Sequence, residues 1–133
     1  MVRDDDAIGI AERRLAAGGG PSGSDFARVR IGAREPAWFR AALDARRTCC
    51  SAPSDAGDEA LAAHLGTTPP PEAAVGGIWS GGNVAALVYA DNLPARTPCG
   101  DVEALDHVLR EAGLALDRAL REREERSAPV SAD

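Results

Sequence analysis

The sequence feature that most constrains the fold is a pair of apolar segments joined by two glycines. Residues 73–80 and 84–89 are both typical of strands, and Gly81 and Gly82 lie between them. Glycine adopts positive φ at no steric cost, so this pair favours the tight turn of a β-hairpin. The second segment is apolar at nearly every position, which predicts a central strand covered on both faces. The remaining chain must therefore supply layers for a sheet.

A long amphipathic helix is predicted after the hairpin. Asp101 is a suitable N-cap, and Glu103 places an acid in the first turn, where the helix dipole favours negative charge. Apolar residues then recur at steps of three and four: Val102, Leu105, Leu109, Ala112, Leu116 and Ala119. Val108, Ala115 and Leu120 broaden this stripe. It exceeds what one sheet face needs, which leaves a seam available for another helix.

Shorter elements are predicted in the first half of the chain. Residues 7–11 alternate in the manner of a short strand, and 26–32 alternate with Ile31 inward and Arg30 outward. Pro36 then opens a helix that should end by Arg47. Its apolar face carries Trp38, Phe39, Ala42 and Leu43.

The middle of the chain predicts one extended segment and one short helix. Residues 48–50 favour an extended conformation, and 54–58 favour a turn. A two-turn helix is expected over 59–65, with Leu61 inward and His64 exposed. Gly66 should stop it.

Overall charge and hydropathy restrict the function classes. The chain of 133 residues fits one domain and carries a net charge of −6, which disfavours nonspecific binding to nucleic acid or to anionic membranes. It shows no secretory leader and no apolar run near ~20 residues. We therefore expect a cytoplasmic location, with neither a nucleic acid nor a membrane as partner.

The closing part of the chain resembles the end of a GAF-like domain. Residues 84–92 read VAALVYADN, and 101–105 and 112–116 read DVEAL and AGLAL, which is similar to the last strand and helix of such domains. Residues 34–43 and 71–73 resemble upstream features of the bacterial versions. The match is closest over 72–123.

This resemblance implies an α/β (α+β) fold. A central antiparallel sheet would carry the terminal helix on one face and the segment 44–75 on the other. It also implies three divisions of the chain. Residues 26–126 form the GAF-like domain, 1–25 a divergent or partly disordered segment with a possible strand, and 127–133 a tail. Domains of this family serve signalling, either as ligand sensors or as dimerising connectors.

Two functions follow as alternatives. The first is a regulatory module that binds a protein, either a second copy of itself or a larger regulatory partner. Its interface would use Val102, Leu105, Leu109, Ala112 and Leu116. The second is a small-molecule sensor with a pocket between residues 84–89 and the segment 44–75. Its lining would use Trp38, Phe39, Trp79 and Tyr89. We favour the first, because the polar groups that a specific pocket needs are sparse.

Catalytic and metal motifs are weak in the sequence. Cys49, Cys50 and Cys99 are odd in number and partly adjacent, which favours small reduced residues over a disulfide framework. With His64 and His107 they lack the CxxC or HxxxH spacing of a zinc site. We therefore expect neither an enzyme nor a cofactor.

A cysteine-dependent redox enzyme remains a third alternative. One enzyme branch of the GAF-like family reduces free methionine sulfoxide with several cysteines. Its closing strand ends in an Asp-Ile-Asp pattern, and Tyr89-Ala90-Asp91 does not match it. Asp91 and Asn92 are better explained as residues that end the strand.

Overall fold

The computed structural model describes residues 1–3, 6–8, 30–65, 68–93 and 95–128. Its elements, in chain order, are β1 (Val2–Arg3), β2 (Asp6–Ile8), β3 (Arg30–Gly32), α2 (Ala37–Ala45), β4 (Cys49–Ser51), α3 (Ala56–His64), β5 (Ala73–Ser80), β6 (Asn83–Asp91) and α4 (Val102–Ser127). The predicted α+β class is confirmed. No helix in the described part is both long and apolar enough to cross a membrane.

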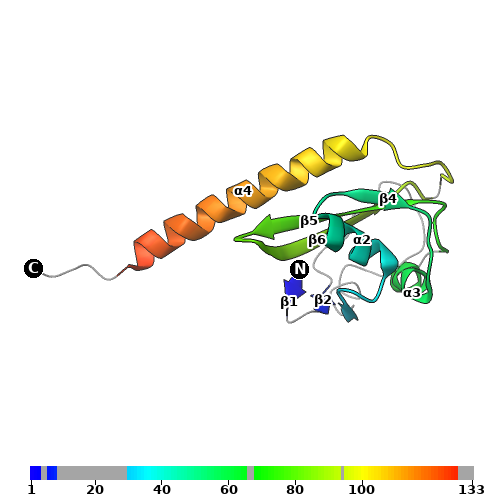
Figure 1. The fold of residues 1–133 in the computed structure, drawn as a ribbon, viewed down its shortest axis with the longest axis horizontal. Helices are drawn as coiled ribbons and strands as arrows, with labels where there is room; N and C mark the ends of the chain where they lie inside the picture. Colours follow the sequence, from blue (N-terminus) through cyan, green and yellow to red (C-terminus); the bar gives the residue numbers. More distant parts are fainter. Residues whose placement is uncertain (4–5, 9–29, 66–67, 94, 129–133) are drawn as a thin grey trace, which may run out of the picture.

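Within the described ranges, two antiparallel sheets of three strands make up the β structure, with the orders β1-β2-β3 and β4-β5-β6 (Figure 1). The predicted hairpin forms two of the three strands of the second sheet, β5 and β6. These strands pair from Ala73↔Asp91 to Ser80↔Asn83, with an irregularity between Ile78 and Trp79. The hairpin turn is the expected one, since Gly81 and Gly82 have φ of 58° and 81°.

The two faces of β5 are covered by different helices, because successive side chains of a strand point to opposite faces. Ala73 and Val75 pack in a core cluster with residues of α2. Gly76 faces the other way, where a β-carbon would lie 2.5 Å from Cδ1 of Leu109 on α4. The small side chains of β5 thus allow both helices to approach the sheet closely.

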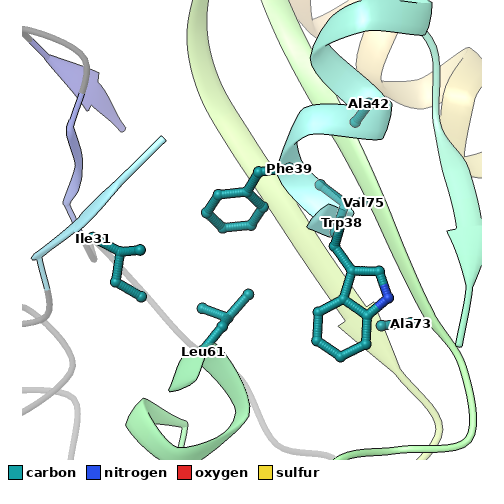
Figure 2. Close-up of a cluster of buried hydrophobic side chains, with 7 residues drawn as sticks. All are labelled: Ile31, Trp38, Phe39, Ala42, Leu61, Ala73 and Val75. Atoms are coloured by element: carbon teal, nitrogen blue, oxygen red, sulfur yellow. The ribbon is translucent and has the colours of Figure 1, made fainter. Parts of the chain in front are cut away.

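The main core lies on the α2 side of the sheet. Figure 2 shows its seven side chains converging from α2, α3, β3 and β5. They are Ile31, Trp38, Phe39, Ala42, Leu61, Ala73 and Val75. The predicted inward positions Ile31 and Leu61 are therefore confirmed, and His64 is exposed as expected. On the predicted apolar face of α2, Trp38, Phe39 and Ala42 are buried, whereas Leu43 is only half-buried.

The prediction that residues 84–89 form a central strand is wrong. β5 is the middle strand of its sheet, whereas β6 is bonded only to β5 among the described residues and is mostly half-buried. β6 also contacts β1. The continuous apolar run of residues 84–89 shows only that this strand is hydrophobic. Side-chain size decides which strand lies in the middle of the sheet, because only the Ala- and Gly-rich β5 admits a helix on each face.

The segment 44–75 does not cover the second face of the sheet as a layer. Its strand β4 instead extends the sheet beside β5, and α2 covers the face, with α3 against α2. α3 also starts three residues earlier than predicted. Asp55 is its N-cap and accepts a hydrogen bond from the Asp58 backbone N–H at 2.9 Å.

Other predicted boundaries agree closely with the structure. α2 follows Pro36 and ends at Ala45, with Arg46 in the left-handed region at φ 53°. Asp101 caps α4 by accepting from the Ala104 N–H at 3.1 Å. The expected strands over 7–11 and 26–32 correspond to β2 and β3 where they are described. The remaining residues of 1–25, residues 26–29, Gly66 and the tail from 129 lie outside the described residues.

Candidate functional site

The first half of the predicted α4 seam packs on this chain's own sheet. Leu109 is only 5% exposed and lies against Gly76. The other four proposed interface residues are half-buried: Val102, Leu105, Ala112 and Leu116. Leu109 is therefore a core residue of the monomer, and it is not a free surface residue in this conformation.

The second half of α4 extends beyond the sheet. Gly113 meets the Trp79 backbone, where a β-carbon would lie 2.5 Å from the carbonyl oxygen. The Ser80 hydroxyl, at the end of β5, donates to the Asp117 carboxylate. Past this point residues 118–128 are all exposed, and Figure 1 shows the helix continuing well past the tip of the hairpin.

The apolar stripe of α4 therefore extends past the end of the sheet that covers its first half. Leu116 lies where the helix leaves the hairpin, and Ala119 and Leu120 continue on the same side of the helix, three and four residues later. Leu120 is 42% exposed. Leu114, which is 55% exposed, points to roughly the opposite side. An uncovered apolar strip thus begins near the end of the sheet.

Three of the four proposed pocket residues belong to packed structure. Trp38 and Phe39 are buried in the core, and the rings of Trp38 and Tyr89 meet edge to face with centroids 5.6 Å apart. The Trp38 indole N–H donates to the Ser51 carbonyl at 3.0 Å. Burial and the neighbouring Asp91 carboxylate raise the pKa of Tyr89, so its hydroxyl stays protonated and donates to Asp91 at 2.8 Å.

Trp79, the fourth pocket residue, lies elsewhere on the hairpin. It pairs with Val84 near the turn, whereas Tyr89 pairs with Val75. Four residues of strand separate Val75 from Trp79, which is roughly 13 Å. The Arg46 guanidinium lies 4.7 Å from the Trp79 ring centroid, a cation–π contact that joins the end of α2 to the hairpin. The four residues therefore do not line one site.

Two aspartates that could have been functional are held in structural hydrogen bonds. Asp58 is fully buried and accepts from the backbone N–H groups of Trp38 and Ser54, each at 2.9 Å. Asp91 accepts from the Tyr89 hydroxyl and, at 2.9 Å, from the Leu93 N–H. Sequence reasoning missed Asp58 as a core residue, because a polar residue in a turn-like stretch gave no signal of burial.

Among the described residues, one group of metal-type ligands converges: Cys50, Glu72 and Cys99. Their ligand atoms all lie within 4.8 Å of one another, and each residue is half-buried. The Cys50 thiol lies 3.5 Å from Glu72 Oε2, and the Cys99 backbone N–H donates to that oxygen at 3.1 Å. Burial, followed by the Cys99 thiol and the Glu72 carboxylate, raises the pKa of Cys50 to about 12.

The absence of short-range spacing hid this cluster from sequence reasoning. Cys50 lies in β4, Glu72 just before β5, and Cys99 in the loop before α4. The other cysteine and the two histidines, which the sequence had already made weak zinc ligands, do not belong to it. Cys49 alternates to the opposite face of β4, where its thiol is 3.7 Å from the Ala41 carbonyl of α2. His64 and His107 are exposed on α3 and α4.

A hollow of about 120 Å³ lies beside this cluster. Residues of the β6 end, the following loop and the first turns of α4 line it, among them Cys99, Asp91, Asn92, Asp101 and Leu105. Its wall combines polar groups with the apolar start of the α4 stripe.

Comparison of the sequence with protein-family models and with curated proteins, and of the structure with solved structures, gave no match to any of them.

Proposed function

We propose that this chain is a non-catalytic regulatory module that acts by protein–protein association, and that the outer half of α4 joins two copies of it. The observation that carries the proposal is the apolar strip of Leu116, Ala119 and Leu120, which continues past the end of the sheet. An extended helix end of this length is marginal alone in water. Packing against a second helix would bury the strip and stabilise those turns.

Charge favours a second copy as the partner. The whole chain carries a net charge of −6, so two copies repel one another in general. Residues 117–126 are different, because they contain four acids and four arginines. The acids are Asp117, Glu122, Glu124 and Glu125, and the bases are Arg118, Arg121, Arg123 and Arg126. Two such segments can pair without net repulsion, with acids facing bases across the helix pair.

The resemblance of residues 72–123 to GAF-like domains supports the same proposal, since a dimerising connector is one of the roles that it implies. Docking on a larger regulatory protein is the alternative within this class. The small-molecule sensor has less support. The space between the sheet and α2 is filled by Trp38 and Phe39, so a ligand there would have to displace core side chains.

Sedimentation velocity over a range of protein concentrations tests the proposal. The wild-type protein is expected to form a dimer, and Leu120→Arg is expected to shift it to a monomer that melts like the wild-type monomer. Leu114→Arg is the matched control, because it places the same charge on the opposite side of the same helix and should leave the dimer intact.

A wild-type monomer at all concentrations would overturn the homodimer. Equal effects of the two substitutions would also overturn it, since a general response to added charge does not depend on the helix side.

A further inference from the structure

The cluster of Cys50, Glu72 and Cys99 has a composition that the interaction module does not explain. Two thiols and a carboxylate come from three separate segments and meet in a half-buried position. Thiolate and carboxylate are both ligands that zinc accepts, and thiolates favour zinc over magnesium or calcium. We propose that Cys50, Cys99 and Glu72 form a binding site for a zinc ion.

The distances fit a tetrahedral ion with small adjustments. Zinc binds sulfur at about 2.3 Å and carboxylate oxygen at about 2.0–2.2 Å, so two ligands on one tetrahedral ion lie about 3.5–3.8 Å apart. The Cys50 thiol and Glu72 Oε2 are already 3.5 Å apart. Every pair in the cluster is within 4.8 Å, so the widest pair has to close by no more than about 1 Å. Side-chain rotation is sufficient for a change of this size.

Electrostatics favours a cation at this point. The Glu72 carboxylate lies beside two thiols in a half-buried place, where its charge attracts a cation. Zinc binds the thiolate form of cysteine, so its binding releases the two thiol protons. The apparent zinc affinity is therefore expected to increase with pH.

The site would join parts of the fold that are distant in sequence. It links β4 and the start of the hairpin to the loop that precedes α4. The Cys99 N–H already bonds to Glu72, so the loop is in place before an ion binds. Three protein ligands leave the fourth position of a tetrahedral zinc to water or to a ligand from outside the chain.

Zinc titration of the reduced protein against a chromophoric chelator tests the site. The wild type should bind one zinc ion per chain. Cys50→Ser, Cys99→Ser and Glu72→Gln should each weaken binding by more than the roughly 10–100-fold that loss of an outer-shell partner costs. Cys49→Ser is the matched control, since it removes a thiol from the same strand but on the opposite face, and it should bind like the wild type.

A second measurement separates loss of the site from loss of the fold. Zinc binding to the native state raises the melting temperature, and this shift should occur in the wild type and in Cys49→Ser but vanish in Cys50→Ser. Circular dichroism without zinc should show that all three proteins are folded.

Three results would overturn the proposal. The reduced wild type could fail to bind zinc, Cys49→Ser could lose as much affinity as Cys50→Ser, or binding could persist in all three ligand variants. If the reduced wild type binds no zinc but mass spectrometry after mild oxidation finds a Cys50–Cys99 disulfide, the pair is a redox couple and not a metal site.

Discussion

The buried side chain of Asp58 connects the start of α2 to the segment ahead of α3. It is fully buried, and its two oxygens accept from Trp38 at the start of α2 and from Ser54 ahead of α3. Its second oxygen also accepts from the Ser54 hydroxyl at 3.3 Å. One carboxylate thereby satisfies the backbone N–H groups of two segments and sets the position of both helices.

We expect Asp58→Ala to lower the free energy of unfolding by about 2–4 kcal/mol, because it leaves the buried Trp38 N–H without an acceptor and removes the hydrogen bonds to Ser54. Urea unfolding followed by circular dichroism measures the change. Glu59→Ala, at an exposed position on the same helix, serves as the control and should stay within about 0.5 kcal/mol of the wild type. Equal stability of the two variants would show that Asp58 is not the connection described.

Two other aspartates predict how stability depends on pH. The Thr48 backbone N–H, which donates to Asp106 at 2.7 Å, holds the pKa of Asp106 below its usual value, and Arg110 adds to this effect. The hydrogen bond from Arg40 lowers the pKa of Asp55 in the same way. A carboxyl group with a lower pKa in the folded state stabilises the fold above its unfolded pKa, and this stabilisation is lost as the pH falls through the folded value.

The free energy of unfolding should therefore decrease as the pH is lowered through about 4 and below. Asp106→Asn should be less stable than the wild type at pH 6, and the difference should shrink at acid pH. Glu111→Gln removes a carboxylate from an exposed position in the middle of the same helix, away from Thr48 and from the helix N-terminus, so its curve should run parallel to that of the wild type. If the free energies of unfolding of Asp106→Asn and the wild type differed by the same amount at every pH, Asp106 would not be a source of the pH dependence.

The elements themselves were largely predictable wherever local chemistry determines them. The two glycines fixed the hairpin turn, Pro36 marked the start of α2, and Asp101 capped α4. Prediction failed where distant contacts decide. The small side chains of β5 were visible in the sequence, but their consequence for the middle position depends on the two helices that pack against them. The meeting of Cys50 with Cys99 likewise depends on β4 pairing with β5 and on where the loop before α4 lies.

The contact between α4 and β5 depends on a glycine inside a helix. A β-carbon on Gly113 would lie 2.5 Å from the carbonyl oxygen of Trp79, which is backbone and cannot rotate away. Alanine is favoured over glycine in a helix by about 1 kcal/mol, so propensity alone predicts that Gly113→Ala is stabilising. We expect the clash to dominate and the variant to lose roughly 1–3 kcal/mol of stability.

Denaturant unfolding decides between these two effects. Gly100→Ala is the control, because a β-carbon there would meet nothing within 4 Å beyond its chain neighbours, and this variant should differ little from the wild type. A more stable Gly113→Ala would show that α4 lies farther from the hairpin than the structure places it.

At the scale of the whole molecule, α4 connects the two proposed sites. The Cys50, Glu72 and Cys99 cluster holds the loop that leads into its first turn, and the uncovered strip lies toward its other end. The helix has 26 residues, a length of about 39 Å. Zinc binding and self-association can therefore be tested separately, since Cys50→Ser should leave the strip intact and Leu120→Arg should leave the cluster intact.

The close contact of Gly113 with the sheet also gives α4 a point about which the helix can tilt. The helix rests on the Trp79 backbone at that point, and about 14 residues follow it as far as Ser127, which is about 21 Å of helix. A tilt of about 10° around this contact moves the far end sideways by about 4 Å, nearly half of the roughly 8–10 Å that separates the axes of two packed helices. A small displacement where the loop meets the sheet would thus change the angle and the spacing between two associated helices.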